Sequence, residues 1–162
     1  MPRRYTAGFT YLGLLLVMAI LGLTMSMAAE LWQTVSQREK EKELIFIGHQ
    51  FRLALKQYRD SDDGDGTLPA KLEDLLRDVR AEDGVKRYLR KIYVDPMTGT
   101  TNWGLVLDDD GGIRGVYSLS TATPLKTTGF SKADALFANK QSYKDWKFKI
   151  KLNEKDPDET EE

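Results

Sequence analysis

Residues 8–29 read GFTYLGLLLVMAILGLTMSMAA, and a short leader that contains Arg3 and Arg4 precedes them. From Phe9 to Ala29 the segment runs for 21 residues without a charge. A transmembrane helix needs about 20 apolar residues, whereas the apolar core of an ordinary secretory signal has roughly 7–15. The segment therefore predicts a membrane-spanning helix. Its N-terminus is expected in the cytoplasm, because basic residues mark the side of a membrane helix that stays inside.

The same residues resemble the N-terminal signal of type IV pilins and type II secretion pseudopilins, in which a glycine is followed by the pattern FTLIELL and an apolar run. The matching residues here begin at Gly8 and Phe9 and continue to Leu15. The resemblance implies that residues 1–8 are a leader, which a prepilin peptidase removes by cutting between Gly8 and Phe9. It also implies that the new amino group of Phe9 is methylated. The implied partners are other pilins or pseudopilins in a filament and an inner-membrane assembly platform.

Gly13 stands where the family has an acidic residue. In the family that carboxylate pairs with the N-terminus of a neighbouring subunit, which offsets an insertion cost of about 2.5–3.5 kcal/mol. Glycine removes both the cost and the pairing. This fits neutral drift, a different neighbour contact, or a minor or tip subunit that does not polymerise alone. Gly22 and Ser26 lie four residues apart in the predicted membrane helix, 9–29, and are small enough to let a second helix approach closely.

Two other interpretations of the apolar segment stay open. Ser26, Met27 and Ala28 resemble a signal peptidase I site, so the segment would be an ordinary signal that is removed after Ala28. Alternatively, the segment would be an uncleaved anchor for an unrelated extracytoplasmic domain. The first residue of the mature protein distinguishes both interpretations from processing after Gly8.

Beyond the apolar segment, the sequence predicts an α+β fold in which one long helix packs on a small antiparallel sheet, as in a pilin. Because no proline occurs between Pro2 and Pro69, the helix is expected to continue from Phe9 to Tyr58. Its outer half, residues 30–60, is apolar along one stripe at helical spacing. The stripe consists of Leu44, Ile47, Phe51, Leu55 and Tyr58.

Residues 61–153 are expected to form the extracytoplasmic domain. A shorter helix is predicted from Pro69 to about Val79, with Leu72, Leu75, Leu76 and Val79 on its inner side. The turn residues DDDGG at 108–112 predict a hairpin between two segments in which apolar residues alternate. The alternating residues are Trp103, Leu105 and Leu107 before the turn and Ile113, Tyr117 and Leu119 after it.

The C-terminal third is expected to hold a long loop over residues 121–142, then a half-buried strand, then a tail. In the strand, Trp146, Phe148, Ile150 and Leu152 alternate with lysines. Residues 154–162 contain six acidic residues and one lysine, which predicts an acidic disordered tail. The helix-then-sheet order and the segment YRDSDDGDGTLP resemble the major-pseudopilin size class.

Composition argues against several classes of function. The chain has no cysteine, one histidine (His49) and a net charge of −1, so disulfides, a zinc site and a general nucleic-acid surface are not expected. The sequence contains neither a G-x-S-x-G nucleophile elbow nor a glycine-rich phosphate loop after a strand. We therefore predict a protein that is not an enzyme and needs no cofactor.

Acidic turns raise the question of calcium, because hard cations bind carboxylate oxygens. Asp60 and Asp62 lie in one such turn, and Asp108 and Asp110 lie in another. The major pseudopilins that the chain resembles hold calcium in a late loop, but their ligands do not align residue by residue with this chain. The first turn lacks the EF-hand spacing, and both turns are equally explained as solvated loops.

Lys86, Arg87, Arg90 and Lys91 form the densest basic cluster, beside Tyr88. Basic residues interleaved with aromatic ones hold single-stranded nucleic acid in some proteins. The main expectation is nevertheless structural: a pseudopilin or minor pilin of a type II secretion or type IV pilus machine, anchored in the bacterial inner membrane with a periplasmic domain. The alternative is a minor pilin of a competence or uptake system that binds DNA or a secreted substrate.

Overall fold

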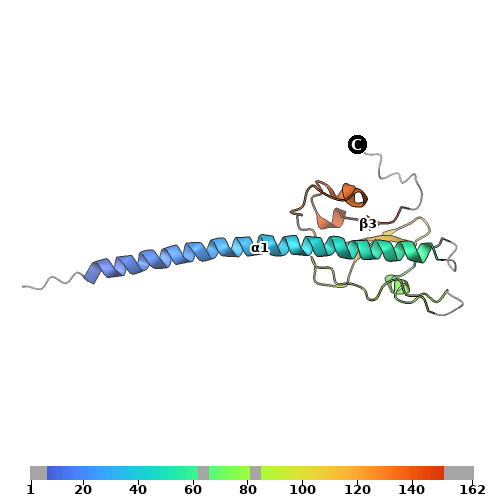
Figure 1. The fold of residues 1–162 in the computed structure, drawn as a ribbon, viewed down its shortest axis with the longest axis horizontal. Coiled ribbons are helices and arrows are strands. Elements are labelled where there is room, and N and C mark those ends of the chain that lie inside the picture. The colour runs from blue at the N-terminus through green and yellow to red at the C-terminus, as the bar shows by residue number, and fades with distance from the viewer. Residues whose placement is uncertain (1–6, 62–65, 81–84, 152–162) are drawn as a thin grey trace, which may run out of the picture. The chain divides into compact units, whose positions relative to one another are not determined.

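Figure 1 shows the fold of the computed structural model, which describes residues 7–61, 66–80 and 85–151. For residues 7–10 and 23–31 it describes the backbone only. The described residues have an α+β fold, as the sequence predicts, with helices and a three-stranded antiparallel sheet.

The chain divides into two compact units, residues 1–39 and residues 40–162. Helix α1 (Ala7–Arg59) supplies the regular structure of the first unit and continues into the second. No helix among the described residues is both long enough and apolar enough to cross a membrane.

The predicted long helix is confirmed, because α1 extends over 53 residues with bounds within two residues of those expected. The helix ends at Arg59, and the residues that follow in the sequence favour turns. The hydroxyl of Ser61 donates to the carbonyl of Tyr58 at 2.9 Å. Lys56 and Arg59 lie in its last turn, where positive charge complements the partial negative charge of a helix C-terminus.

In the first unit, the large apolar side chains of α1 between residues 11 and 21 are 48–66% exposed. They are Tyr11, Leu12, Leu14, Leu15, Leu16, Val17, Met18, Ile20 and Leu21. This part of the helix is thus apolar on all sides.

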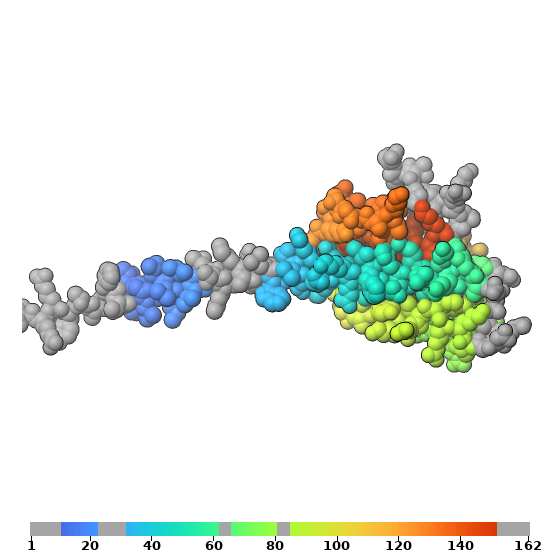
Figure 2. All heavy atoms as spheres, viewed as in Figure 1, coloured from blue at the N-terminus to red at the C-terminus, as the bar shows by residue number. Residues whose placement is uncertain are grey.

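In the second unit, the predicted apolar stripe of α1 is confirmed, because all five of its residues are at most 6% exposed. Phe51 packs edge-on against Trp103, with ring centroids 5.1 Å apart. Figure 2 shows this part of α1 between the yellow-green residues that follow the helix and the orange residues of the C-terminal third. Burial of one apolar side chain of this size stabilises the folded state by about 1.5–3 kcal/mol, so the stripe holds α1 firmly in the domain.

The helix predicted from Pro69 to Val79 is wrong in length, and of its predicted inner residues Leu72, Leu75 and Leu76 pack on the core whereas Val79 does not. The structure has only a short 3-10 helix, η1 (Leu72–Leu75), in which Leu75 is fully buried. Val79 is 77% exposed, and the neighbouring Asp78 is buried instead. The reason is that the backbone of Asp78 leaves the helical path and donates to the carbonyl of Lys86 at 2.9 Å, which turns Val79 outward.

The predicted hairpin is confirmed. Strand β1 (Gly104–Leu107) pairs antiparallel with β2 (Ile113–Tyr117), and β2 pairs antiparallel with β3 (Phe148–Lys149), in the order β1-β2-β3. In the turn, the amide of Asp108 donates to the carbonyl of Gly112 at 2.8 Å. Gly111 has a φ of 80°, a conformation that glycine adopts at little cost.

The apolar residues of the hairpin do not form the two buried rows that their alternation suggests. Of the six, only Trp103 and Ile113 are buried, and Leu107 is 55% exposed. A register shift pairs Val106 with Gly115 and Leu107 with Ile113, so β2 contains one extra residue and its alternation changes there: Ile113 is buried before the extra residue, and Val116 is buried after it in place of Tyr117.

The C-terminal strand is confirmed, although its regular part is only β3. Trp146, Phe148 and Ile150 are at most 4% exposed, and the lysines between them point to the other face. The predicted loop over residues 121–142 contains one 3-10 helix, η2 (Lys132–Phe137), and a second, η3 (Tyr143–Asp145), follows it. Leu152 and the predicted acidic tail lie outside the described residues.

Candidate functional site

The residues of the predicted processing site lie at the beginning of α1. Gly8 and Phe9 fall within its first turn, and their side chains lie outside the description. Among the described residues, no atom lies within 4 Å of where a side chain would begin at Gly13 or Gly22, so the space beside each glycine is open. The side chain of Ser26 is not described.

Four carboxylates are buried among the described residues, and the sequence did not single out any of them. Glu41, Asp78, Asp95 and Asp134 are each at most 3% exposed. A buried carboxylate is costly unless it accepts hydrogen bonds or pairs with a cation. Each of the four meets this condition, with partners that lie between two residues away (Arg80 for Asp78) and 102 residues away (Tyr143 for Glu41).

Glu41 links α1 to the loop before η3. Its Oε1 accepts from the amides of Leu125 and Lys126, at 2.6 and 3.2 Å, and from the hydroxyl of Tyr143 at 2.9 Å. Three donors from a stretch without regular pairing therefore converge on one oxygen of the helix. Charge-assisted hydrogen bonds of this kind are stronger than neutral ones.

Asp78 forms an ion pair with Arg80 at 2.8 Å and accepts from the hydroxyl of Tyr88 at 3.0 Å. Hydrogen bonds from Arg80 are the largest cause that lowers the pKa of Asp78, from 3.8 to about 2. The guanidinium of Arg80 also lies 3.6 Å from the ring centroid of Tyr58 at the end of α1. The pair thereby fastens the segment after η1 to the helix.

Asp95 organises the Asp-Pro-Met-Thr-Gly turn. It accepts from the amide of Met97 at 2.9 Å and from the hydroxyl of Thr98 at 3.0 Å. It also accepts from the buried hydroxyl of Ser118, just after β2, at 2.7 Å. The turn is thus tied to the sheet through one carboxylate.

Asp134 gathers a histidine and a serine, but in an arrangement that differs from a catalytic triad. Nε2 of His49 and Oγ of Ser131 both contact Oδ2 of Asp134 at 2.7 Å, and Arg52 donates to Oδ1 at 2.9 Å. In a triad the serine hydroxyl donates to the histidine, whereas here it donates to the carboxylate. Burial alone would raise the pKa of Asp134, but the hydrogen bonds from Ser131, His49 and Arg52 lower it below its usual value.

The predicted basic cluster is on the surface. Lys86, Arg87, Arg90 and Lys91 are all exposed, and the ammonium of Lys91 lies 5.5 Å from the ring centroid of Tyr93. The four residues share one stretch of chain and extend into solvent. The structure thus leaves them accessible to a partner.

The predicted calcium residues are not gathered into one site within the described part of the chain. Asp60 pairs with Arg59 at 2.8 Å, and Asp62 lies outside the described residues. Asp108 and Asp110 belong to the β1–β2 turn. Among the described residues, no group of three or more acidic or histidine side chains is placed to hold a metal ion.

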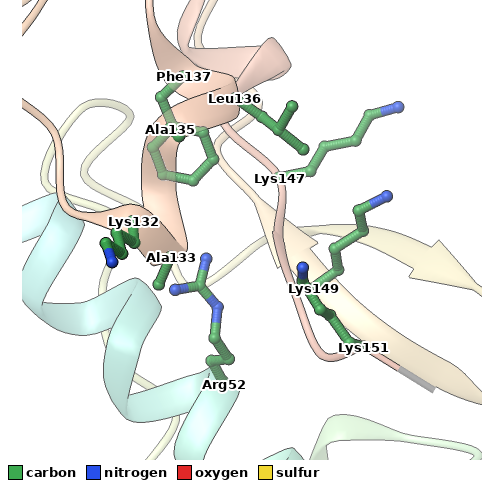
Figure 3. A pocket seen from close by; sticks show the side chains of 9 residues that line it. All are labelled: Arg52, Lys132, Ala133, Ala135, Leu136, Phe137, Lys147, Lys149 and Lys151. Atoms are coloured by element: carbon green, nitrogen blue, oxygen red, sulfur yellow. The ribbon is translucent and has the colours of Figure 1, made fainter. Parts of the chain in front are cut away.

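A cavity of about 270 Å³ opens between α1, η2 and the C-terminal strand, as Figure 3 shows. Five basic side chains line it, together with an apolar wall from η2. The basic residues are Arg52, Lys132, Lys147, Lys149 and Lys151. The alternation of lysines after Trp146 indicated part of this surface, but nothing in the sequence placed Arg52 or Lys132 beside it.

Comparison of the chain with protein-family models, with curated proteins and with solved structures finds no match.

Proposed function

We propose that this chain is a pseudopilin or minor pilin, a structural subunit of a type II secretion or type IV pilus machine that is assembled through its N-terminal helix. One observation carries the proposal. A single helix, α1, has exposed apolar side chains on every side in the first unit and a narrow buried stripe in the second. In an isolated monomer these exposed apolar side chains of α1 contribute nothing to stability. Exposed apolar area of this extent is typical of a surface that contacts lipid or another protein.

A further surface of α1 supports assembly. Phe46 is 59% exposed and Leu53 is 50% exposed, although both lie among the buried residues of the stripe in sequence. They are seven residues apart, so they share one face of the helix, which is turned away from the domain core. Two large apolar side chains on this outer face are suited to packing against a neighbouring subunit.

In this proposal the chain catalyses no reaction. Residues 9–29 hold the precursor in the inner membrane, with the domain on the periplasmic side, until a prepilin peptidase removes residues 1–8. The assembly platform then moves the mature helix from lipid into the core of a short filament, where the same apolar side chains contact other helices. Gly13 favours a minor or tip position, since it supplies no carboxylate for the amino group of a neighbour.

Intact mass and N-terminal analysis of the mature protein test the proposal. We expect a chain that begins with N-methylated Phe9. Gly8→Leu should leave the precursor uncut, because the peptidase needs a small residue before the scissile bond. Gly22→Leu is the matched control and should be processed normally. A wild-type chain that begins at Ala29, or one that keeps its leader, would contradict the proposal.

The position in the filament has its own test. Expressed without its partners, the processed chain should form no filaments, and electron microscopy of sheared surface or periplasmic fractions would show this. Gly13→Glu restores the missing carboxylate and is expected to increase incorporation into filaments. Homopolymers of the wild-type chain would refute the minor or tip role while leaving the family assignment in place.

A second candidate function is binding of DNA or a secreted substrate through Lys86, Arg87, Arg90 and Lys91. Their exposure on one stretch of chain favours it. Charge reversal at Arg87 and Arg90 should then abolish uptake or secretion while processing and assembly continue. Unchanged uptake and secretion in this variant would remove the candidate.

A further inference from the structure

The cavity beside η2 concentrates positive charge. Five basic residues (Arg52, Lys132, Lys147, Lys149 and Lys151, together the basic pocket) line it, and none of its described lining residues is acidic. Figure 3 shows Arg52 rising from α1 toward η2, with Lys147 and Lys149 extending from the opposite strand. Like charges gathered around one cavity repel each other, and an anion would relieve that repulsion.

The alternation of residues 147–151 explains why three lysines, Lys147, Lys149 and Lys151, line the basic pocket. In residues 147–151 the order is KFKIK, and Phe148 and Ile150 are buried in the core. Side chains alternate across a strand, so all three lysines point to the opposite face. The same lysines lie along an edge of the described sheet, where positive charge also discourages pairing with another chain.

Arg52 adds a donor that its own ion pair leaves unused. Its Nη1 donates to Asp134 at 2.9 Å, while its Nε is buried and has no hydrogen-bond partner among the described residues. A buried donor without a partner is uncommon in folded proteins. Because this Nε is shielded from solvent and the charge of Arg52 is balanced by Asp134, the lysine ammonium groups are the part of the basic pocket that a carboxylate can reach.

We propose that the basic pocket binds the acidic C-terminal segment of the same chain, residues 154–162. The segment carries six acidic residues and one lysine. It begins three residues beyond Lys151, which lines the pocket. The carbonyl of Lys151 accepts from Arg59 at 2.8 Å, which fixes the point from which the segment starts at the end of α1.

Reach and concentration favour this occupant over a free anion. Eleven residues follow Lys151, and an extended chain covers about 3.3 Å per residue, so the segment spans roughly 35 Å when fully extended. A tether of this length gives an effective concentration in the millimolar range. Each exposed carboxylate–lysine pair is weak, so binding depends on several pairs together and weakens as salt rises. The contact is therefore reversible, and an acidic partner surface would compete with the segment.

Zero-length carbodiimide cross-linking of the full-length chain in detergent tests the proposal. The reagent joins a lysine amine to a nearby carboxylate with loss of water, and peptide mass spectrometry locates the link. We expect links from Lys132 and Lys147 to the acids of residues 154–162, and their loss when the acids are changed to Asn and Gln. Raising NaCl to a few tenths molar and above should reduce them several-fold. Lys71 is exposed and lies outside the basic pocket, so it is the matched control. It should rarely link to the acids of residues 154–162.

Two further measurements show whether the bound acidic segment belongs to the same chain and exclude an effect of misfolding. In a mixture of light and ¹⁵N-labelled chains, the expected links join peptides of the same isotope, whereas links between isotopes would overturn the assignment to the same chain. Removal of residues 154–162 should raise the acetylation rate of Lys132 and Lys147 several-fold relative to Lys71, because nearby carboxylates keep amines protonated. Equal linking of Lys71, or unchanged acetylation rates after truncation, would overturn the proposal. None of these readouts depends on a role in a pilus or secretion machine.

Discussion

At Gly48, α1 lies close against Phe148 of β3. A Cβ added at this position would lie under 3.0 Å from three ring carbons of Phe148 in β3. Carbon atoms in favourable contact are about 3.5–4.0 Å apart, so the ring or the helix would have to move by more than about 0.5 Å. Substitution of Gly48 by alanine therefore tests how tightly the helix and the sheet are packed.

Two effects of Gly48→Ala oppose each other. Alanine stabilises a helix interior by about 0.8–1 kcal/mol relative to glycine. Overpacking of a well-packed core costs about 1–3 kcal/mol. Phe148 is fully buried and is held edge-on by Phe137, with ring centroids 4.9 Å apart, so the cost should fall near the upper end. We expect a net loss of about 1–2 kcal/mol in the free energy of unfolding.

Urea and thermal unfolding followed by tryptophan fluorescence measure this loss. Trp103 and Trp146 are buried in the second unit and report its unfolding, whereas Trp32 is 75% exposed and adds a constant background. A loss of 1 kcal/mol lowers Tm by roughly 3–6 °C in a unit of this size, so the expected decrease is roughly 3–12 °C. If the clash is the cause, Gly48→Ala should cost clearly less in a Phe148→Leu background than alone.

The control for Gly48→Ala is Gln57→Ala, an exposed position of the same helix, which should change stability by less than about 0.5 kcal/mol. A Gly48→Ala variant that is more stable than the wild type by about 1 kcal/mol would refute the reasoning. That result would mean that helix propensity alone decides and that the close approach of the sheet is not rigid.

Three other perturbations address the buried carboxylates. Because Arg80 lowers the pKa of Asp78 from 3.8 to about 2, the pair contributes fully above about pH 4 and loses its contribution, about 2 kcal/mol, as the pH falls through about 2. Arg80→Met should therefore flatten this part of the Tm-versus-pH curve, and an unchanged acid slope would contradict the assignment. Glu41→Ala removes the oxygen that accepts from Leu125, Lys126 and Tyr143 and should cost about 2–4 kcal/mol, with faster hydrogen exchange first in the loop that Glu41 holds. Asp95→Ala should cost a similar amount by urea unfolding, whereas Ser118→Ala should cost about 1 kcal/mol, and equal losses would contradict the idea that the carboxylate organises the turn.

The parts of the fold that the sequence predicts correctly are those with a local cause. The absence of proline and the spacing from Leu44 to Tyr58 predict α1 and its buried stripe, and DDDGG predicts the hairpin. These features depend on neighbours within a few residues. The register shift that adds a residue to β2 is also local, but the sequence carries no distinctive mark of it, so the burial of Val116 in place of Tyr117 could not be predicted.

The parts that could not be predicted depend on partners distant in the chain. Asp78 is buried in place of Val79 with its carboxylate satisfied by Tyr88 and by Arg80, whose guanidinium in turn lies against Tyr58 of α1, 22 residues earlier in the chain. Asp134 meets His49 across 85 residues. No periodicity marks such pairs, because burial of a charge depends on donors that only the folded chain brings together. The predicted processing site, by contrast, is a property of the sequence itself and needs a biochemical test.

The distances along the chain that the buried carboxylates span determine when the domain can fold. Glu41 is separated from Tyr143 by 102 residues, and Phe148 and Ile150 complete the core that α1 begins. Because synthesis begins at the N-terminus, the acids that pair with distant residues lack those partners until almost the last described residue has been made. The apolar stripe of α1 likewise stays uncovered until then. The core of the second unit is thus completed only when nearly all of its described residues have been synthesised. Under the periplasmic location that we propose for this domain, late completion would keep the chain unfolded until most of it has crossed the membrane.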